Sequence, residues 1–166
     1  LSGAVAKPGI YEVEFGITLR QLIDLGGGMR GGSTMQAILL GGAAGGFVGP
    51  NDLDLPLTME ATRAAGSSLG SGVVMVLDHS VDMVDQLRRI AAFFRDESCG
   101  QCVPCRVGTV RQEEIVSRLA KGVQSQDIEL LRELGTVMRD ASICGLGQTA
   151  NSAIDSAINK LKVFAV

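Results

Sequence analysis

The four cysteines of this 166-residue chain are the residues best suited to chemistry. Cys99, Cys102 and Cys105 lie three residues apart, and Cys144 follows alone much later. Thiols this close in sequence are poorly placed to form unstrained disulfides with one another, but they can hold neighbouring corners of one inorganic cluster. The spacing predicts a [4Fe–4S] centre for one-electron transfer, with these four cysteines as its metal ligands.

Two other kinds of cysteine site have to be considered. A structural zinc site also takes four thiolates, but its ligands usually come as two short-spaced pairs, whereas here they divide into three and one. Disulfides need an oxidising compartment, and the chain has neither a signal peptide nor the cysteine-dense composition of a small secreted scaffold. A zinc-stapled interaction module with no redox role is therefore the main alternative, and disulfides rank third.

Composition excludes some classes of partner. The formal net charge is −3, and no Lys/Arg cluster is present, so no nucleic-acid partner is predicted. The hydrophobic content of 46% is enough for a real core. Its longest apolar runs, such as residues 73–77 and 90–94, fall far short of the roughly 20 residues that a membrane-spanning helix needs. No direct membrane insertion is predicted.

Glycine is concentrated in the first half of the chain, which predicts two domains, residues 1–79 and 80–166. In the first, the alternation over 11–15 predicts a strand, and further strands are predicted at 37–40 and 73–77. Thr18 and Gln21 form a capping-box pattern for a short helix that ends at Gly26 in a left-handed conformation. A small mixed sheet curled around one helix is typical of a β-grasp domain.

The second domain is predicted to be helical. Apolar residues recur at helical spacing over 83–94, 128–141 and 154–161, with Ser152 as the N-cap of the last helix. Another helix should begin at the cysteine loop, where Pro104 suits the first turn, and end at Gly122. Four such helices can pack as a bundle. The predicted fold class is thus α+β, a β-grasp domain followed by a four-helix bundle that carries the cluster.

The predicted helix starts place the cysteines where unpaired amides and a partial positive charge stabilise an anionic cluster. Several neighbours are candidates for a surrounding shell that tunes the cluster. Glycines beside the ligands allow backbone N–H groups to approach sulfur. The alternative for each glycine is an ordinary turn, and for each arginine it is a solvated position on the surface. The candidates are Gly100, Gln101, Arg106 and Gly145, with Gly147 and Arg111 further out.

Two segments give a specific resemblance. Residues 97–109, ESCGQCVPCRVGT, and residues 142–149, SICGLGQT, resemble the flavoprotein, NADH-binding subunit of NADH:quinone oxidoreductase. They are equally similar to the diaphorase subunits of NAD-linked hydrogenases and formate dehydrogenases. Residues 39–50 resemble the soluble-ligand-binding β-grasp domain of the same family. The resemblance covers essentially the whole chain.

The resemblance implies an electron-transfer function. In that family a hydride passes from NADH to FMN, and electrons leave singly through a [4Fe–4S] cluster whose ligands correspond to Cys99, Cys102, Cys105 and Cys144. A thioredoxin-like [2Fe–2S] subunit docks nearby, and further iron–sulfur subunits take the electrons onward. The implied localisation is cytoplasmic, or on the cytoplasmic face of a membrane-bound complex.

The FMN and NADH site of that family lies in a separate N-terminal domain with its own glycine-rich signature, which residues 1–166 do not match. The glycine-rich run at 41–46 fits neither Gly-x-Gly-x-x-Gly nor a P-loop, and is interpreted as a β-grasp loop. We therefore expect a C-terminal portion of a longer flavoprotein, or a separate piece that completes one. Alone, it should bind neither FMN nor NAD(H). A respiratory, hydrogenase, formate dehydrogenase or bifurcating assembly is consistent with the sequence.

Overall fold

The computed structural model describes residues 1–164. The chain divides into two compact units, Leu1–Val81 and Asp82–Val166, which we call the sheet unit and the helical unit. Residues 165–166, the end of the predicted helical domain, lie outside the described residues. Within the described part of the chain, no helix combines the length and the apolarity that crossing a bilayer requires.

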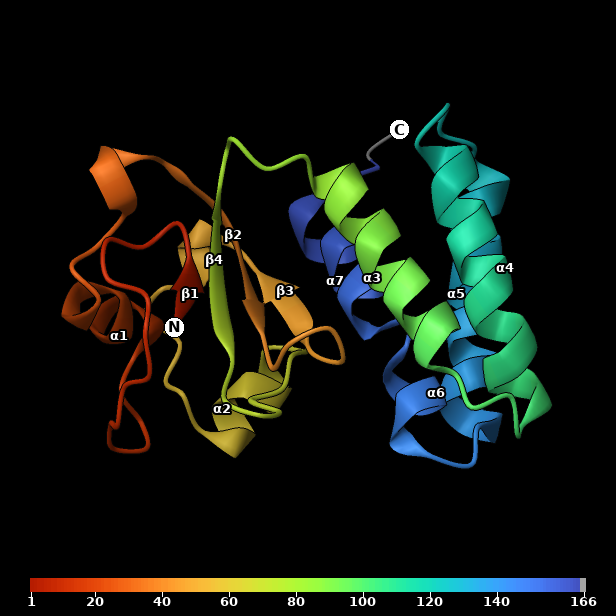
Figure 1. The fold of residues 1–166 in the computed structure, drawn as a ribbon, viewed down its shortest axis with the longest axis horizontal. Helices are drawn as coiled ribbons and strands as arrows, with labels where there is room; N and C mark the ends of the chain where they lie inside the picture. The colour runs from red at the N-terminus through yellow and green to blue at the C-terminus, as the bar shows by residue number, and fades with distance from the viewer. Residues whose placement is uncertain (165–166) are drawn as a thin grey trace. The chain divides into compact units, whose positions relative to one another are not determined.

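The sheet unit is built on a four-stranded mixed sheet with strand order β1–β4–β2–β3 (Figure 1). β1 (Ser2–Gly3) pairs parallel to β4 (Val74–Asp78), while β2 (Met35–Leu40) pairs antiparallel to both β4 and β3 (Gly46–Val48). The strands predicted at 37–40 and 73–77 are confirmed as β2 and β4. The glycine-rich run at 41–46 connects β2 to β3, so it is a hairpin loop of the sheet, as interpreted from the sequence.

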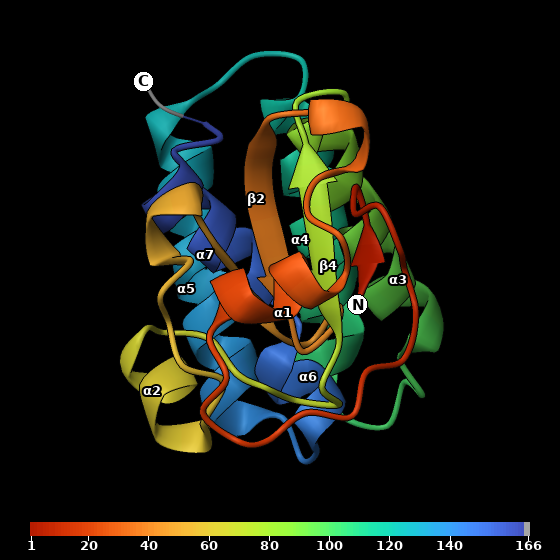
Figure 2. The same ribbon diagram turned by 90° about the vertical axis from the view of Figure 1, so that its left-hand side faces the viewer.

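Helix α1 (Leu19–Leu25) covers one face of this sheet, in front of β2 and β4 in Figure 2. Its N-terminus carries the predicted capping box, in which the Thr18 side chain accepts from Gln21 N–H and the Gln21 side chain accepts from Thr18 N–H. The buried side chains of this helix and of the strands form one apolar core: Val5, Leu19, Leu22, Ile23, Ile38, Leu40, Val48, Leu57, Val74 and Val76.

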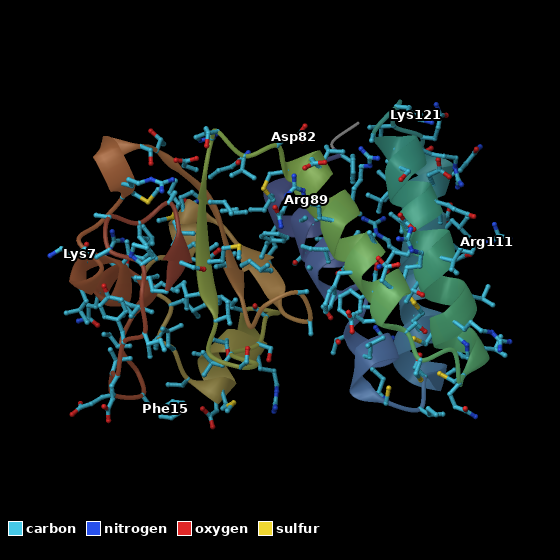
Figure 3. The ribbon with its side chains drawn as sticks, viewed as in Figure 1. Lys7, Phe15, Asp82, Arg89, Arg111 and Lys121 are labelled. Carbon is cyan, nitrogen blue, oxygen red and sulfur yellow. The ribbon has the colours of Figure 1, made fainter. Side chains whose placement is uncertain are left out.

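Two local predictions for the sheet unit are wrong. Residues 11–15 form no strand, because this segment pairs with no strand, and its residues 12–15 are exposed. Phe15 is 78% exposed and lies away from the strands (Figure 3), and the Tyr11 hydroxyl donates locally to Lys7 O. Gly26 is not left-handed, since its φ is −73°; Gly27 and Gly28 take the positive φ values that turn the chain.

Five other short elements of the sheet unit were not predicted, namely the strands β1 and β3, one α-helix and two 3₁₀ helices. Helix α2 (Met59–Ala64) is capped by Thr58, whose side chain accepts from Ala61 N–H. The 3₁₀ helices η1 (Arg30–Gly32) and η2 (Pro50–Asp52) are too short to show any periodicity. None of these elements carries a cysteine.

The helical unit contains four long helices and one short one. The long helices, α3 (Met83–Glu97), α4 (Val103–Leu119), α5 (Ser125–Ala141) and α7 (Ser152–Leu161), confirm the predicted four-helix architecture. The short helix α6 (Gly145–Thr149) was not predicted, because its glycines were interpreted only as neighbours of a ligand. The α+β fold class, a small sheet domain followed by a helical bundle, is therefore confirmed.

Packing in the helical unit depends on small residues at helix contacts. Gly108 of α4 lies against Met138 of α5, and a Cβ on Gly108 would be 2.5 Å from Met138 Cγ. The two helices approach closely because Gly108 has no side chain.

The N-cap of α7 is Asn151, without a side-chain cap bond, so the prediction of Ser152 as cap is wrong: Ser152 is the first helical residue.

Candidate metal centre

The four cysteines come from two loops and the helices that follow them. Cys99 lies in the connection between α3 and α4, Cys102 is the N-cap of α4, and Cys105 lies in the first turn of α4. Cys144 is the N-cap of α6. Figure 1 shows the α3–α4 connection and α6 at the same end of the helical unit. Two helix N-termini therefore carry cysteines at this end, where unpaired amides favour anionic sulfur.

The α3–α4 connection and the α5–α6 connection are in direct contact at the cysteines. The backbone N–H of Ile143, and after it that of Cys105, lowers the pKa of the Cys102 thiol from its ordinary value. A Cβ on Gly147 of α6 would be only 2.8 Å from Cys105 Cβ. The structure thus brings the Cys144 loop against Cys102 and Cys105, although 38 residues separate Cys105 from Cys144 in the sequence.

The loop that carries Cys99 is held by three local features. Gly100 has φ +75°, a conformation that disfavours any side chain. The Arg106 guanidinium donates from Nη1 to Gly100 O over 3.3 Å, so an arginine of α4 fastens the loop that precedes it. Within α4, the Thr109 hydroxyl donates to Cys105 O over 2.8 Å. These contacts fix the backbone from which the first three cysteines project.

Two serine hydroxyls lie beside the cysteine sulfurs, and sequence reasoning missed both. Ser98 Oγ is 3.3 Å from Cys105 Sγ. Ser142 is 6% exposed, and its hydroxyl has no hydrogen bond of standard geometry within residues 1–164, yet it helps to lower the pKa of Cys102. Only their closeness to cysteines in the sequence could have pointed to these serines. Ser98 directly precedes Cys99, and Ser142 lies two residues before Cys144.

The residues present suit an iron–sulfur cluster in chemistry. All four cysteines are free thiols; Cys105 is buried, Cys102 half-buried, and Cys99 and Cys144 exposed. A buried hydroxyl left without a regular partner, Ser142 Oγ, lies at Cys102, and Gly147 leaves open the space that a Cβ would fill against Cys105. Within residues 1–164 no three His, Cys, Asp or Glu side chains already converge as a metal site, so the four-ligand set stays a prediction.

The other residues predicted to surround the cluster differ in how near they lie to the cysteines. Arg106 and Gly100 belong to the cysteine loop and contact each other. Gln101 and Gly145 are exposed, and a Cβ on Gly145 would meet nothing within 4 Å. Arg111 does not flank the cysteines: it is exposed and pairs with Glu114 on α4 over 2.6 Å, further along the helix (Figure 3). The reason is that its guanidinium reaches a carboxylate on its own helix face.

Comparison with protein families gives two matches. Residues 85–163 match the NADH-ubiquinone oxidoreductase-F iron–sulfur binding region, and residues 1–53 match the SLBB domain. The first range includes all four cysteines and the whole contact between Cys102 and Ile143. The second falls within the sheet unit.

Individual relatives agree with these matches. The chain is 38% identical over 161 residues to the NADP-reducing hydrogenase subunit HndC of Solidesulfovibrio fructosivorans, covering 96% of the chain and 33% of the relative. It is 42% identical over 135 residues to a subunit of the NADH-quinone oxidoreductase of Escherichia coli, covering 80% and 30%. A crystal structure of NAD⁺-reducing [NiFe]-hydrogenase matches with TM-score 0.83 and 32% identity, covering 98% of this chain and 28% of that one. The chain therefore spans about a third of the length of these relatives.

Proposed function

Because the chain belongs, through residues 85–163, to the NADH-ubiquinone oxidoreductase-F iron–sulfur binding family, we propose that it is the electron-transfer part of an NADH-linked oxidoreductase. In this proposal single electrons pass between FMN and downstream iron–sulfur centres through a [4Fe–4S] cluster. The FMN and NADH site belongs to a domain or partner chain outside these residues. The relatives named above are subunits of oxidoreductases, which supports this role.

One observation carries the proposal. A Cβ on Gly147, three residues after Cys144, would be only 2.8 Å from Cys105 Cβ, and the N–H of Ile143 lowers the pKa of the Cys102 thiol. This contact joins the two cysteine-bearing loops within the family's iron–sulfur binding region. It supports the assignment of Cys99, Cys102, Cys105 and Cys144 as one ligand set, because the lone fourth cysteine is carried by the loop that lies against Cys102 and Cys105.

The protein's own groups have defined roles in this proposal. A bound cluster would supply a site that accepts and releases one electron without proton transfer or bond cleavage. The four thiolates hold it, and the N–H groups of Ile143 and Cys105 offset negative charge on Cys102 sulfur. Arg106 keeps the Cys99 loop in place through Gly100 O. The exposure of Cys99 and Cys144 leaves the centre near the surface, where electrons can enter and leave.

The partners are proposed from the same family. They are an FMN- and NADH-binding domain or chain, a thioredoxin-like [2Fe–2S] subunit, and further iron–sulfur subunits that carry electrons onward. The relatives named above are themselves subunits, which supports an assembly of several chains. We propose a cytoplasmic location, either free or at the cytoplasmic face of a membrane-bound complex.

Metal analysis tests the cluster directly against the zinc alternative. Protein purified without oxygen should contain about four irons and four acid-labile sulfides per chain, absorb visible light, and give an electron paramagnetic resonance signal when reduced by dithionite. A zinc-stapled module should contain one zinc, no sulfide and no colour. Finding one zinc per chain without sulfide would reject the proposed function.

A further inference from the structure

We propose, on the premise of the function above, that the hydroxyls of Ser98 and Ser142 donate hydrogen bonds to the cysteine sulfurs of the cluster and thereby set its reduction potential. Both are positioning residues for electron transfer, since each acts on the cluster through a cysteine sulfur. The two serines come from different loops, so each hydroxyl can be removed without the other.

The direction of the Ser98 hydrogen bond follows from its neighbours. Ser98 Oγ is 3.3 Å from Cys105 Sγ, and Gly100 N–H donates to the same Oγ over 3.4 Å. A cysteine that ligates iron is a thiolate and has no proton to give. The proton of this contact must therefore come from Ser98, whose oxygen already accepts from Gly100.

Ser142 is held by its backbone, and its hydroxyl lies beside Cys105: a Cβ on Gly147 would be 2.3 Å from Ser142 Oγ and 2.8 Å from Cys105 Cβ. Ser142 N–H donates to Met138 O over 3.1 Å, and Ser142 O accepts from Gln148 Nε2 over 3.0 Å. The buried hydroxyl has no regular partner within the described residues. A Cβ on Gly147 would lie 2.3 Å from Ser142 Oγ, so only glycine there leaves this hydroxyl its place. Buried hydroxyls are rarely left unpaired, and a thiolate sulfur beside Ser142 supplies an acceptor.

Donors to the ligand sulfurs act on the electron equilibrium. When one electron enters the cluster from a reduced flavin or from dithionite, no bond forms or breaks, but the cluster gains one negative charge. A hydrogen bond to sulfur stabilises the reduced form more than the oxidised form, so it raises the reduction potential. Loss of either hydroxyl should lower that potential and leave the four ligands in place.

The test is a redox titration of the full chain with its cluster, followed by electron paramagnetic resonance. Ser98→Ala and Ser142→Ala should each lower the reduced-to-oxidised ratio at a fixed ambient potential by about threefold to tenfold, the size expected for one net hydrogen bond. Ser98→Thr keeps a hydroxyl and should restore the original ratio. Ser117→Ala, on α4 but twelve residues beyond Cys105, is the matched control and should change nothing.

The outcomes separate this inference from the proposed function. An unchanged potential in both alanine variants, with full iron content, overturns the inference but leaves the cluster assignment intact. Absence of iron and sulfide from the unsubstituted chain overturns the proposed function itself. If neither alanine variant retains a cluster even after reconstitution with iron and sulfide, the inference is also overturned, because donors that only tune a potential are not needed for assembly.

Discussion

The sheet unit and the helical unit are stabilised in different ways. In the sheet unit, α1 and the strands close an apolar core that uses no cysteine. In the helical unit, one end carries the four free cysteines. The pKa of one of them, Cys102, is lowered, and a buried hydroxyl beside them, Ser142 Oγ, has no regular partner. The sheet unit is thus held by hydrophobic burial, whereas on the proposed function the cysteine end of the helical unit is held in part by its bound cluster. The difference predicts that metal loss affects one unit and core truncation the other.

The largest expected effect is removal of a cluster ligand. Cys144→Ser and Cys105→Ser should each abolish or convert the cluster, because a missing thiolate leaves one iron without its protein ligand. Hydrogen exchange should then speed up in residues 82–164 and stay unchanged in residues 1–81. Unchanged iron content in Cys144→Ser would mean that Cys144 is not the fourth ligand.

The reciprocal change truncates the core of the sheet unit. Leu22 is 5% exposed and belongs to the apolar core of α1 and the strands. Leu22→Ala should destabilise the sheet unit by about 2–5 kcal/mol, from lost burial and the cavity left behind. Tyr11 is the single tyrosine of a chain without tryptophan, so tyrosine fluorescence reports the unfolding of this unit. Iron content should not change; a parallel loss of iron would show that the two units are not independent.

A smaller effect sharpens the comparison within the helical unit. Gly147→Ala places a methyl group 2.3 Å from Ser142 Oγ and 2.8 Å from Cys105 Cβ, so α6 must shift away from α4. Overpacking of this kind costs about 1–3 kcal/mol, and iron content should fall. Gly145→Ala is the matched control on the same helix, where the new methyl group meets nothing within 4 Å. Equal iron content in the two variants would argue against close α4–α6 contact at the cluster.

The smallest effect is a pH dependence of the sheet unit. The hydroxyl of Ser80 and then that of Ser33 hold the pKa of the Asp78 carboxyl below its ordinary value of 3.8. A carboxyl with a lowered pKa in the folded state stabilises that state above its unfolded pKa, and this contribution is lost as the pH falls through the folded value. With Asp78→Asn, the free energy of unfolding of the sheet unit, followed by tyrosine fluorescence, should therefore fall less steeply as the pH is lowered. A fall as steep as that of the unsubstituted chain would contradict this role.

The sequence was most informative where one residue type forces one local structure. The Thr18 and Gln21 capping box, the strands at 37–40 and 73–77, and Pro104 in the first turn of α4 follow from local hydrogen bonding and periodicity. The alternation over 11–15 misled because strand formation needs a partner strand, which the sequence alone does not reveal.

For the site, the structure places Cys102, Cys105 and Cys144 at helix N-termini, as the sequence predicted, and their assignment as one ligand set with Cys99 stays a prediction. The serines could not be found in the same way, because a hydroxyl has no spacing rule that links it to a sulfur. Ser98 contacts the sulfur of Cys105, seven positions further along the chain, and Ser142 comes to lie beside Cys105 only once α6 packs on α4. Arg111 is a solvated surface arginine, the alternative that the sequence favoured, and it pairs with Glu114 on its own helix.

Crystallographic anomalous scattering at the iron edge tests the central claim most directly. The account predicts one compact group of four irons at the N-termini of α4 and α6, bound by the sulfurs of Cys99, Cys102, Cys105 and Cys144. Iron density held by the first three cysteines with Cys144 turned away, or a single zinc in its place, would contradict it.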